Sequence, residues 1–323
     1  MEQIKWGIIG CGDVTEVKSG PAFNKVPNSS LVAVMRRDAA KAKDYAARHG
    51  VKKWHSNAEE LIHDEEVNAV YVATPPSSHH EYAIAAIRAG KPVYVEKPMT
   101  ADAPAALELA KAVHEHNAKL VVAHYRRQMP YFKKIKQLLE DEVIGKPLMV
   151  QLHYHALPLS ATELAIPKTA WRVNAAVSGG GLFHDLAPHQ LDLMHYFFGK
   201  AKKLDGFATN QLGLYDAADF VTGQILFETG CAFSGTWSFA APQQRDTCEI
   251  IGTKGSISCS IFNMKTITVT VNGVTNEFYF EPLQHVQQPM IEATVNYFLD
   301  EATNPCAVED GVLIMQWMDV FTS

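Results

Sequence analysis

Lys97 is the first residue in this sequence whose position suggests chemistry. It lies in the segment Val93–Pro98 (VYVEKP), where a short apolar run is followed by Glu96, Lys97 and Pro98. Most lysines are solvated surface residues, but the carboxyl end of a buried strand is where open parallel sheets bind ligands. The following proline keeps Lys97 out of the helical region and is compatible with a cis peptide bond. We therefore predict that Lys97 is a catalytic residue.

A second motif places a carboxylate and an imidazole at helical spacing. In the segment Ser178–Asp192 (SGGGLFHDLAPHQLD), Asp185 precedes His189 by four residues, so both side chains share one face if the segment is a helix. Pro188 would then disturb that helix or mark its first turn. An aspartate can orient a histidine that acts as general acid or base. We predict that Asp185 and His189 are catalytic together with Lys97.

The first apolar run of the chain leads into a glycine-rich turn, Gly10–Thr15 (GCGDVT). Gly10 permits a tight turn, and Gly12 lets the backbone approach a pyrophosphate at the start of the next helix. Thr15 stands where the full G-x-G-x-x-G fingerprint has a third glycine, which predicts slightly looser packing there. The alternative is an ordinary turn without a ligand. Because the turn opens a strand–helix series, we predict that a dinucleotide is bound by Gly10, Gly12, Asp13 and Val14.

The end of the second apolar run, Leu31–Asp38 (LVAVMRRD), bears on the choice of cofactor. NAD-binding domains usually place an acidic residue here to hold the ribose 2′-hydroxyl, but this chain has Arg36 and Arg37. Two guanidinium groups suit a 2′-phosphate, so we predict NADP as the preferred cofactor, with NAD as the alternative. Asp38 could still accept a hydrogen bond from a ribose. Both arginines could also be solvated residues at a strand end.

Other candidate cofactor contacts follow two strand ends that should meet at the same crevice. The segment Val72–Pro76 (VATPP) is followed by His79, and the other strand end carries Glu96 and Lys97. The cofactor contacts predicted here are Thr74, Pro75, His79, Glu96 and Lys97.

The elements that must position these residues alternate in the first part of the chain. Continuous apolar runs at residues 5–10, 31–35, 69–73, 92–95 and 120–123 are typical of parallel strands covered on both faces. Between them, residues 39–49, 78–89 and 101–116 have helical patterns; the first two end at glycines, and the third follows Thr100, a possible N-cap. The order predicts a doubly wound α/β sheet.

The pattern changes after residue 123. A helix is predicted at residues 131–141 and a strand at 147–155. Consecutive β-type runs follow between residues 204 and 280 without intervening helices, and two helical patterns at 290–301 and 310–321 close the chain. Strands joined by turns such as Asn272-Gly273 predict a mostly antiparallel sheet. We therefore predict a Rossmann domain over residues 1–123 and an α+β domain over residues 124–323.

Composition excludes several classes of protein. The chain has 323 residues and a net charge of −6, which gives no basic face for nucleic acid and no attraction to an anionic membrane. Its five cysteines form no C-x-x-C pair, and no apolar run approaches the ~20 residues of a membrane span. We expect a cytoplasmic protein. The histidines show no recognisable zinc spacing, so no metal is expected, and no G-x-S-x-G elbow indicates a hydrolase.

In this order, the motifs resemble the glucose–fructose oxidoreductase/inositol dehydrogenase family, the Gfo/Idh/MocA group. The resemblance rests on GIIGCGDV, the Thr-Pro turn with His79, AGKPVYVEKPMTA, YRRQMP followed by IGKP, TAWR, and SGGGLFHDLAPHQLDL. It implies an open-faced C-terminal sheet, a homodimer or homotetramer formed through that sheet, and roles around the substrate for Lys97, Asp185 and His189. It also implies cleft-lining positions for Arg126, Trp171 and Arg172.

These observations predict an oxidoreductase that moves a hydride between NAD(P) and a CH–OH or carbonyl carbon of a sugar, polyol or related cyclic alcohol. Two alternatives remain within the same fold. One is a glycosidase that retains its NAD, which the arginines after the second strand disfavour. The other is a non-catalytic sugar sensor, which would have no need of Lys97, Asp185 and His189 together.

Overall fold

A computed structural model describes residues 2–323, which form two compact units. Unit 1 contains the residues up to Gln128 together with Leu283–Met315, and unit 2 contains Met129–Pro282 and Gln316–Ser323. The sequence-based division instead assigned everything after residue 123 to the second domain. The difference has a physical reason: the ring of Phe298 packs 5.6 Å from that of Trp6, so a late segment completes the core of unit 1.

Unit 1 is built on a six-stranded parallel sheet with the order β3-β2-β1-β4-β5-β6. The five predicted strands are confirmed. β3 was missed because its three residues (KWH) form no apolar run. The strands are β1 (Ile4–Ile9), β2 (Ser29–Met35), β3 (Lys53–His55), β4 (Ala69–Val72), β5 (Val93–Val95) and β6 (Leu120–Val122).

Local chemistry explains two helix ends of unit 1, one of them at another residue than predicted. α2 ends at Gly50 in the left-handed region, at a φ of 66°. α5 begins at Asp102, whose side chain accepts from the amide of Ala105 at 2.8 Å, so the predicted N-cap Thr100 was wrong. The elements are α1 (Asp13–Val17), η1 (Gly20–Asn24), α2 (Ala39–His49), α3 (Ala58–Ile62), η2 (Pro76–Ser78), α4 (His79–Arg88), α5 (Ala103–Glu115), η3 (Tyr125–Gln128), α11 (Gln288–Phe298) and part of α12 (Val308–Thr322).

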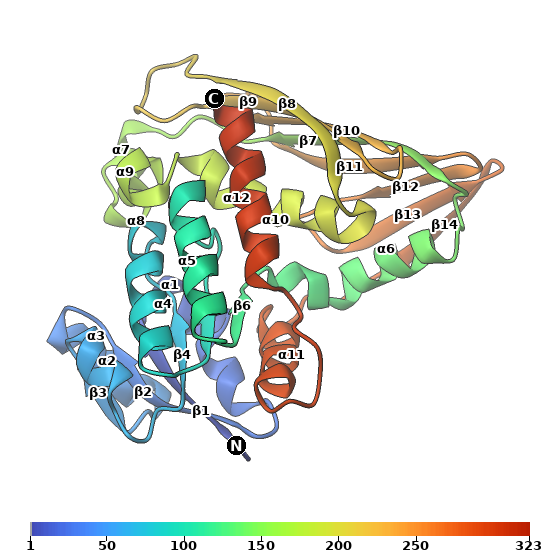
Figure 1. Cartoon of the computed structure of the whole chain (residues 1–323). Helices are drawn as coiled ribbons and strands as arrows, with labels where there is room; N and C mark the ends of the chain where they lie inside the picture. Colours follow the sequence, from blue (N-terminus) through green and yellow to red (C-terminus); the bar gives the residue numbers. More distant parts are fainter. Residues whose placement is uncertain (1) are drawn as a thin grey trace. The chain divides into compact units, whose positions relative to one another are not determined.

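Both faces of the parallel sheet are covered. On one face, Trp6 packs against Phe23 of η1 and Phe298 of α11. On the other face, Gly7 leaves room for α3, because a Cβ there would lie 2.6 Å from the Leu61 side chain. α4 and α5 lie side by side (Figure 1). Cover on both faces explains why the strands read as continuous apolar runs.

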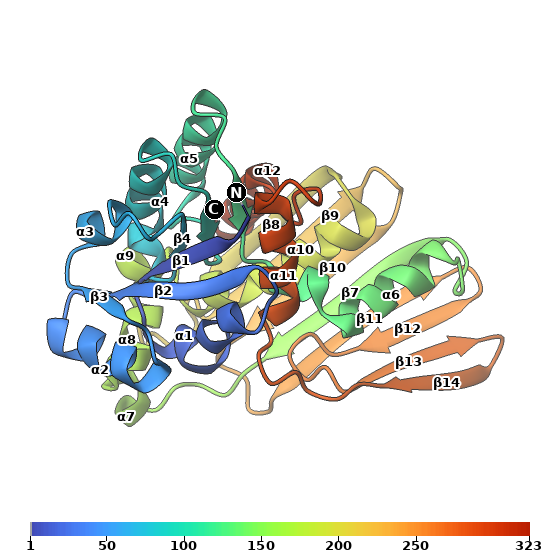
Figure 2. The same cartoon turned by 90° about the horizontal axis from the view of Figure 1, so that it is seen from below.

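Unit 2 is built on an eight-stranded sheet with the order β14-β13-β12-β11-β7-β10-β9-β8 (Figure 2). Neighbours are antiparallel except β7 and β10, so the predicted mostly antiparallel sheet is confirmed. The strands are β7 (Pro147–His155), β8 (Ala201–Thr209), β9 (Phe220–Phe227), β10 (Ala232–Ser238), β11 (Arg245–Gly252), β12 (Gly255–Cys259), β13 (Thr266–Val271) and β14 (Val274–Tyr279).

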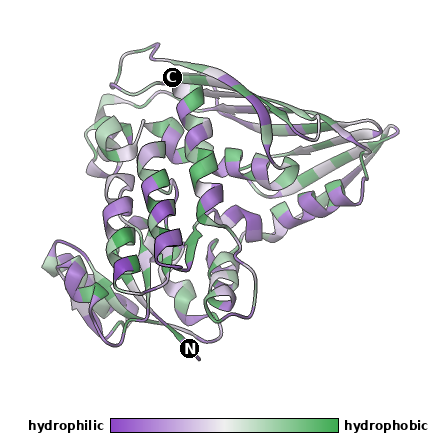
Figure 3. Ribbon diagram, viewed as in Figure 1, coloured by the Kyte–Doolittle hydropathy of each residue, from purple (hydrophilic) through white to green (hydrophobic). Residues whose placement is uncertain are grey.

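One face of this sheet packs on helices. Trp237 of β10 contacts Phe183 of α10 and Phe321 of α12, with ring centroids 5.1 and 6.2 Å apart. Along α6, the buried residues Tyr131, Phe132, Ile135 and Leu138 recur at helical spacing, as burial of one face requires, and both hydrophilic and hydrophobic residues are present in the helix (Figure 3). The helices are α6 (Pro130–Glu140), α7 (Ala161–Leu164), α8 (Pro167–Val173), α9 (Ala175–Ser178) and α10 (Leu182–Phe198). Across residues 2–323, no helix has both the length and the apolar surface to traverse a bilayer.

Candidate active site

The glycine-rich turn between β1 and α1 needs both of its glycines, for different reasons. Gly10 has a φ of 92°, and a Cβ there would lie 2.8 Å from the Thr74 amide nitrogen. Apart from Gly12 and its two chain neighbours, the only atom of residues 2–323 within 4 Å of a Cβ at Gly12 would be the Gly10 oxygen, at 3.8 Å. Gly10 is therefore required by packing against the end of β4, whereas Gly12 leaves its outer side open to a ligand. This arrangement fits a dinucleotide phosphate.

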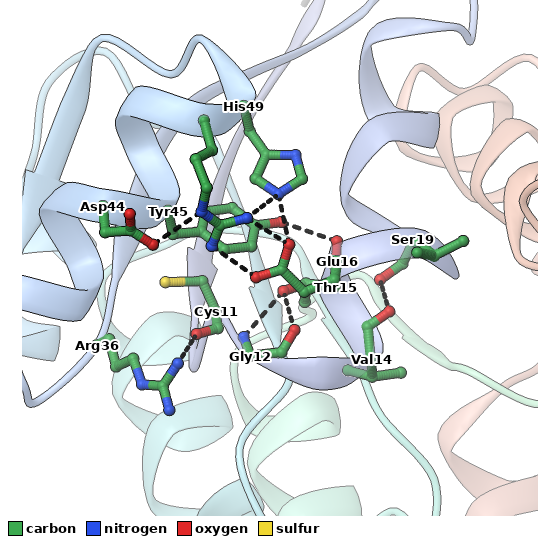
Figure 4. Close-up of polar contacts among 12 residues, drawn as sticks. Cys11, Gly12, Val14, Thr15, Glu16, Ser19, Arg36, Asp44, Tyr45 and His49 are labelled. Carbon is green, nitrogen blue, oxygen red and sulfur yellow. Dashed lines mark hydrogen bonds and ion pairs between the residues drawn. The ribbon is translucent and has the colours of Figure 1, made fainter.

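Thr15 caps the turn in place of a third glycine. Its hydroxyl accepts from the Gly12 amide at 2.9 Å and donates to the Gly12 carbonyl at 2.8 Å (Figure 4). The side chain is fully buried, and Tyr45 of α2 donates to the Thr15 carbonyl at 2.8 Å. The threonine therefore closes the turn through hydrogen bonds. α1 is short, with Asp13 in its first turn and Val14 after it.

Arg36, at the end of β2, reaches back over this turn. Its Nη1 lies 3.3 Å from the Cys11 carbonyl oxygen (Figure 4), and Arg37 beside it is exposed. The Asp38 carboxylate caps α2, because it accepts from the Lys41 amide at 3.1 Å and pairs with the Lys41 ammonium at 3.4 Å. Positive charge therefore borders the turn, and the Asp38 carboxylate is already engaged.

Glu16 of α1 holds α2 against the turn. Its two oxygens each lie 2.8 Å from a guanidinium nitrogen of Arg48, and His49 approaches one of them at 2.8 Å. Arg48 also pairs with Asp44 at 2.8 Å. The hydrogen bond from Arg48 is the main reason that the pKa of Glu16 is lowered to about 2. The ion pair thus fixes α1 relative to the helix that follows the two arginines.

We expect the variant Glu16→Gln to reduce the free energy of unfolding by about 1 kcal/mol at pH 7, a value already discounted for solvent screening at this partly exposed pair. The Glu16 pKa is lowered in the folded state. Its contribution is therefore present above the ordinary glutamate pKa, about 4.3, and is lost as pH falls toward about 2. Urea unfolding of the wild type and of Glu16→Gln between pH 7 and pH 3 measures how the difference between their free energies of unfolding narrows. Glu115→Gln, on the exposed surface of α5, is the control. A difference in the free energy of unfolding that does not depend on pH would contradict the stabilising role of the Glu16 ion pair.

Glu96, which directly precedes Lys97, is a buried carboxylate with three donors. Tyr71 donates to its Oε1 at 2.5 Å, the Gln287 side-chain amide donates to the same oxygen at 2.6 Å, and the Lys97 amide reaches Oε2 at 3.2 Å. Glu96 is only 6% exposed. The backbone of Lys97 is therefore anchored to a fixed charge in the core of unit 1, and its peptide bond to Pro98 is cis.

Gln287 was missed by sequence reasoning and completes this anchor. Its side-chain oxygen accepts from Tyr94 at 3.0 Å, and its backbone amide donates to the carbonyl of Lys18 at 3.2 Å. Burial, followed by the charge of Glu96, raises the pKa values of Tyr71 and Tyr94, so both hydroxyls stay protonated donors. The segment before α11 thus connects the end of α1 to the strand end that carries Lys97.

His79 bridges the two strand ends of the predicted crevice. Its ring nitrogens lie 2.6 Å from the Thr74 carbonyl oxygen and 2.9 Å from that of Pro98. The side chain is 1% exposed, and burial lowers the pKa of His79, while the two carbonyl acceptors oppose this shift because a neutral imidazole can donate to only one of them. Both nitrogens therefore face backbone carbonyls, and His79 supports the turns that begin with Thr74-Pro75 and Lys97-Pro98. Direct contact between His79 and a cofactor stays a prediction.

Asp185 and His189 lie on α10, so the helical segment on which their shared face depends is present. Pro188 is inside it, several residues beyond its first turn. Asp185 Oδ2 pairs with Arg172 Nε at 3.1 Å, and the Arg172 guanidinium lies 4.6 Å from the centroid of the Trp171 ring. The helix follows three glycines with φ values of 90°, 157° and 84°. This conformation lets the chain pass close to the first turn of α10.

Each unit brings together its own set of predicted residues. In unit 1, Arg126 is buried beneath Tyr125, 5.4 Å from its ring centroid. Among residues 2–323, no three His, Cys, Asp or Glu side chains converge as a metal-binding group. The joint action of Lys97 and His189 stays a prediction. Unit 1 holds Gly10, Gly12, Asp13, Val14, Arg36, Arg37, Thr74, Pro75, His79, Glu96, Lys97 and Arg126, and unit 2 holds Trp171, Arg172, Asp185 and His189.

Comparison with known protein families assigns both parts of the chain. Residues 4–124 match the family model described as "Oxidoreductase family, NAD-binding Rossmann fold", and residues 132–258 match the "GFO/IDH/MocA C-terminal domain". The chain belongs to the Gfo/Idh/MocA family of oxidoreductases. Its N-terminal part is therefore an NAD-binding Rossmann domain, as predicted from the glycine-rich turn.

Individual relatives match most or nearly all of the length of this chain. Oxidoreductase P35 of Formosa agariphila is 49% identical, covering 99% of this chain and 98% of its own. The 1,5-anhydro-D-fructose reductase of Ensifer adhaerens is 27% identical, covering 84% of this chain and 81% of its own. The structure of a levoglucosan dehydrogenase in complex with NADH superposes with a TM-score of 0.88 at 21% identity, covering 99% and 96% of the two chains. This last likeness shows the shared fold.

Proposed function

We propose that this oxidoreductase is an NADP-preferring dehydrogenase or reductase acting on a CH–OH or carbonyl carbon of a sugar, polyol or related cyclic alcohol. The observation that carries the proposal is the anchored Lys97. Its backbone is bonded to the buried Glu96 carboxylate, at the same sheet edge as the glycine-rich turn of the Rossmann domain. The names of the relatives, a 1,5-anhydro-D-fructose reductase and a levoglucosan dehydrogenase, support a carbohydrate-like substrate.

The cofactor, when bound, supplies a nicotinamide carbon that accepts or releases a hydride. The Lys97 ammonium donates a hydrogen bond to the substrate oxygen and stabilises the negative charge that develops on it. His189 takes the hydroxyl proton in the oxidative direction and returns it in the reductive direction. Asp185, which pairs with Arg172 at 3.1 Å, keeps the imidazole oriented. The finer expectations of a homodimer or homotetramer and a cytoplasmic location stay predictions.

A substrate panel tests this function. The near-ultraviolet absorbance of reduced nicotinamide is followed with NADP and NAD, each in both redox states. The panel contains myo-inositol, D-glucose, 1,5-anhydro-D-fructose, levoglucosan and trans-1,2-dihydrobenzene-1,2-diol. We expect net cofactor turnover with at least one member, faster with NADP, and lowered about 100-fold or more in Lys97→Ala.

Each other result of the panel points to a different function. A nitrophenyl glycoside is assayed beside the panel, and release of its aglycone without net cofactor turnover would reject the proposal in favour of a NAD-retaining glycosidase. Saturable binding of panel members without any reaction would reject it in favour of a sensor.

A further inference from the structure

One short loop of unit 2 is held by several hydrogen bonds to a single carboxylate. The loop Ser260–Asn263 follows β12, and the carboxylate of Asp246 on β11 lies beneath it. Asp246 accepts from the amides of Ile261, Phe262 and Asn263 at 3.2, 2.7 and 3.2 Å, and also from the hydroxyl of Ser260. A carboxylate with several amide donors binds a loop more strongly than neutral hydrogen bonds do. The backbone of Phe262 is therefore fixed.

A tyrosine holds the start of the same loop. The amide of Ser260 donates to the hydroxyl of Tyr131 at 3.2 Å, and this hydroxyl donates to the carbonyl of Thr266 at 2.9 Å. Burial is the main cause that raises the pKa of Tyr131 above its ordinary value, so the hydroxyl keeps its proton. The loop is thus held from two directions, by an element of the sheet and by α6.

The fixed loop places an aromatic ring beside the candidate general base. The ring of Phe262 lies 6.0 Å from that of His189 at an interplanar angle of 79°, and 5.1 Å from that of Tyr154. His189 is only 6% exposed, whereas Phe262 and Tyr154 stay partly exposed. Phe262 therefore borders the imidazole directly, Tyr154 borders Phe262, and both rings still offer surface to a ligand.

This surface has the chemistry of a site for ring-shaped polyols. A cyclic sugar or cyclitol has an apolar C–H side as well as hydroxyl groups, and aromatic side chains bury such apolar surface efficiently. Near His189 in sequence, the Asp185–Arg172 ion pair offers groups that can hydrogen-bond hydroxyls. An open-chain polyol presents no comparable flat apolar side.

We propose that Phe262 and Tyr154 form an aromatic wall of the substrate site beside His189, that this wall receives the C–H side of a cyclic substrate, and that Asp246 is a positioning residue that holds Phe262 in the wall. The inference rests on the proposed function for its substrate class. It adds two residues that select for a ring and one that acts only through its neighbour.

Calorimetric binding of a matched pair of probes tests the wall. 1,5-Anhydro-D-glucitol and D-sorbitol differ mainly in ring closure, and both are alcohols, so NADPH can be present without turnover. We expect Phe262→Leu to weaken binding of the cyclic probe about 5- to 10-fold and binding of the open-chain probe by less than about 2-fold. Leucine keeps the apolar volume, so the fold should be retained. Phe278→Leu, on β14 of the same unit, is the control and should leave both affinities unchanged.

A double-mutant comparison tests the role of Asp246. Asp246→Asn should selectively weaken binding of the cyclic probe. Combining it with Phe262→Leu should reduce the affinity little further, because both changes act through the aromatic ring of Phe262. Additive losses, or equal losses for both probes, would assign Asp246 a merely structural role.

The outcomes separate this inference from the proposed function. Catalytic turnover with an unchanged ring preference in Phe262→Leu would overturn the wall and leave the dehydrogenase proposal intact. Selective ring binding without turnover in the substrate panel would support the wall and reject the dehydrogenase. Failure of the wild type to bind 1,5-anhydro-D-glucitol, myo-inositol and methyl β-D-glucopyranoside would overturn the wall.

Discussion

Replacing Lys97 by alanine should lower turnover by about 100-fold or more while leaving NADPH binding within about 3-fold of wild type. The side chain removed is the group expected to stabilise charge on the substrate oxygen as the hydride moves. An interaction made mainly in the transition state raises turnover rather than binding, so its loss should appear in kcat. Steady-state kinetics with the best panel substrate, together with a fluorescence titration of NADPH, measures both quantities.

The surroundings of Lys97 make the result interpretable. Its backbone is held by Glu96 through the amide, and the alanine variant keeps that amide and its 3.2 Å contact. The Glu96 network with Tyr71 and Gln287 is therefore preserved, and loss of turnover cannot be ascribed to collapse of the strand end. Lys111→Ala, on an exposed position of α5, removes a lysine charge without touching this network and is the control. Near-wild-type turnover in Lys97→Ala would exclude the lysine from the mechanism.

Much of unit 1 could be predicted because its signals are local. Apolar runs of a few residues predicted five parallel strands, and the glycine-rich turn was located from its G-x-G sequence motif. The confirmed requirement for glycine at Gly10 is a local steric fact, set by a positive φ and by the backbone after β4. In unit 2, the four-residue spacing of Asp185 and His189 indicated a shared face on condition of a helix, and the structure places both residues on α10.

The contacts that support the site could not be predicted in this way, because they join distant parts of the chain. Gln287 donates a hydrogen bond to Glu96 although the two residues are 191 positions apart, and no sequence pattern near either residue predicts this contact. The same holds for Asp246 and Phe262, which depend on where β12 returns beside β11. A lone glutamine or aspartate in a polar segment is usually solvated, so its burial becomes visible only with the fold.

The second large effect is expected at the cofactor end of the same unit. Arg37→Ala should raise the dissociation constant of NADPH about 10-fold or more and change that of NADH by less than about 3-fold. A charge-assisted hydrogen bond to phosphate contributes roughly 1.5–3 kcal/mol, and about 1.4 kcal/mol corresponds to a factor of ten. Only NADPH carries the 2′-phosphate that would receive it. Fluorescence titrations of both cofactors at low and high salt measure the difference, which should shrink as salt screens the charges.

Arg37 is the sharper target because Arg36 is already engaged with the protein. Arg36 contacts the Cys11 carbonyl within the glycine-rich turn, so Arg36→Ala can disturb the turn itself and should weaken both cofactors together with any specific loss for NADPH. Arg37 is exposed, and Asp38 beside it is engaged in capping α2. Arg88→Ala, at the exposed end of α4, makes the same change in net charge and is the control. If Arg37→Ala weakened NADPH and NADH equally, Arg37 would have no part in selecting the phosphate, and the preference for NADP would lose its main support.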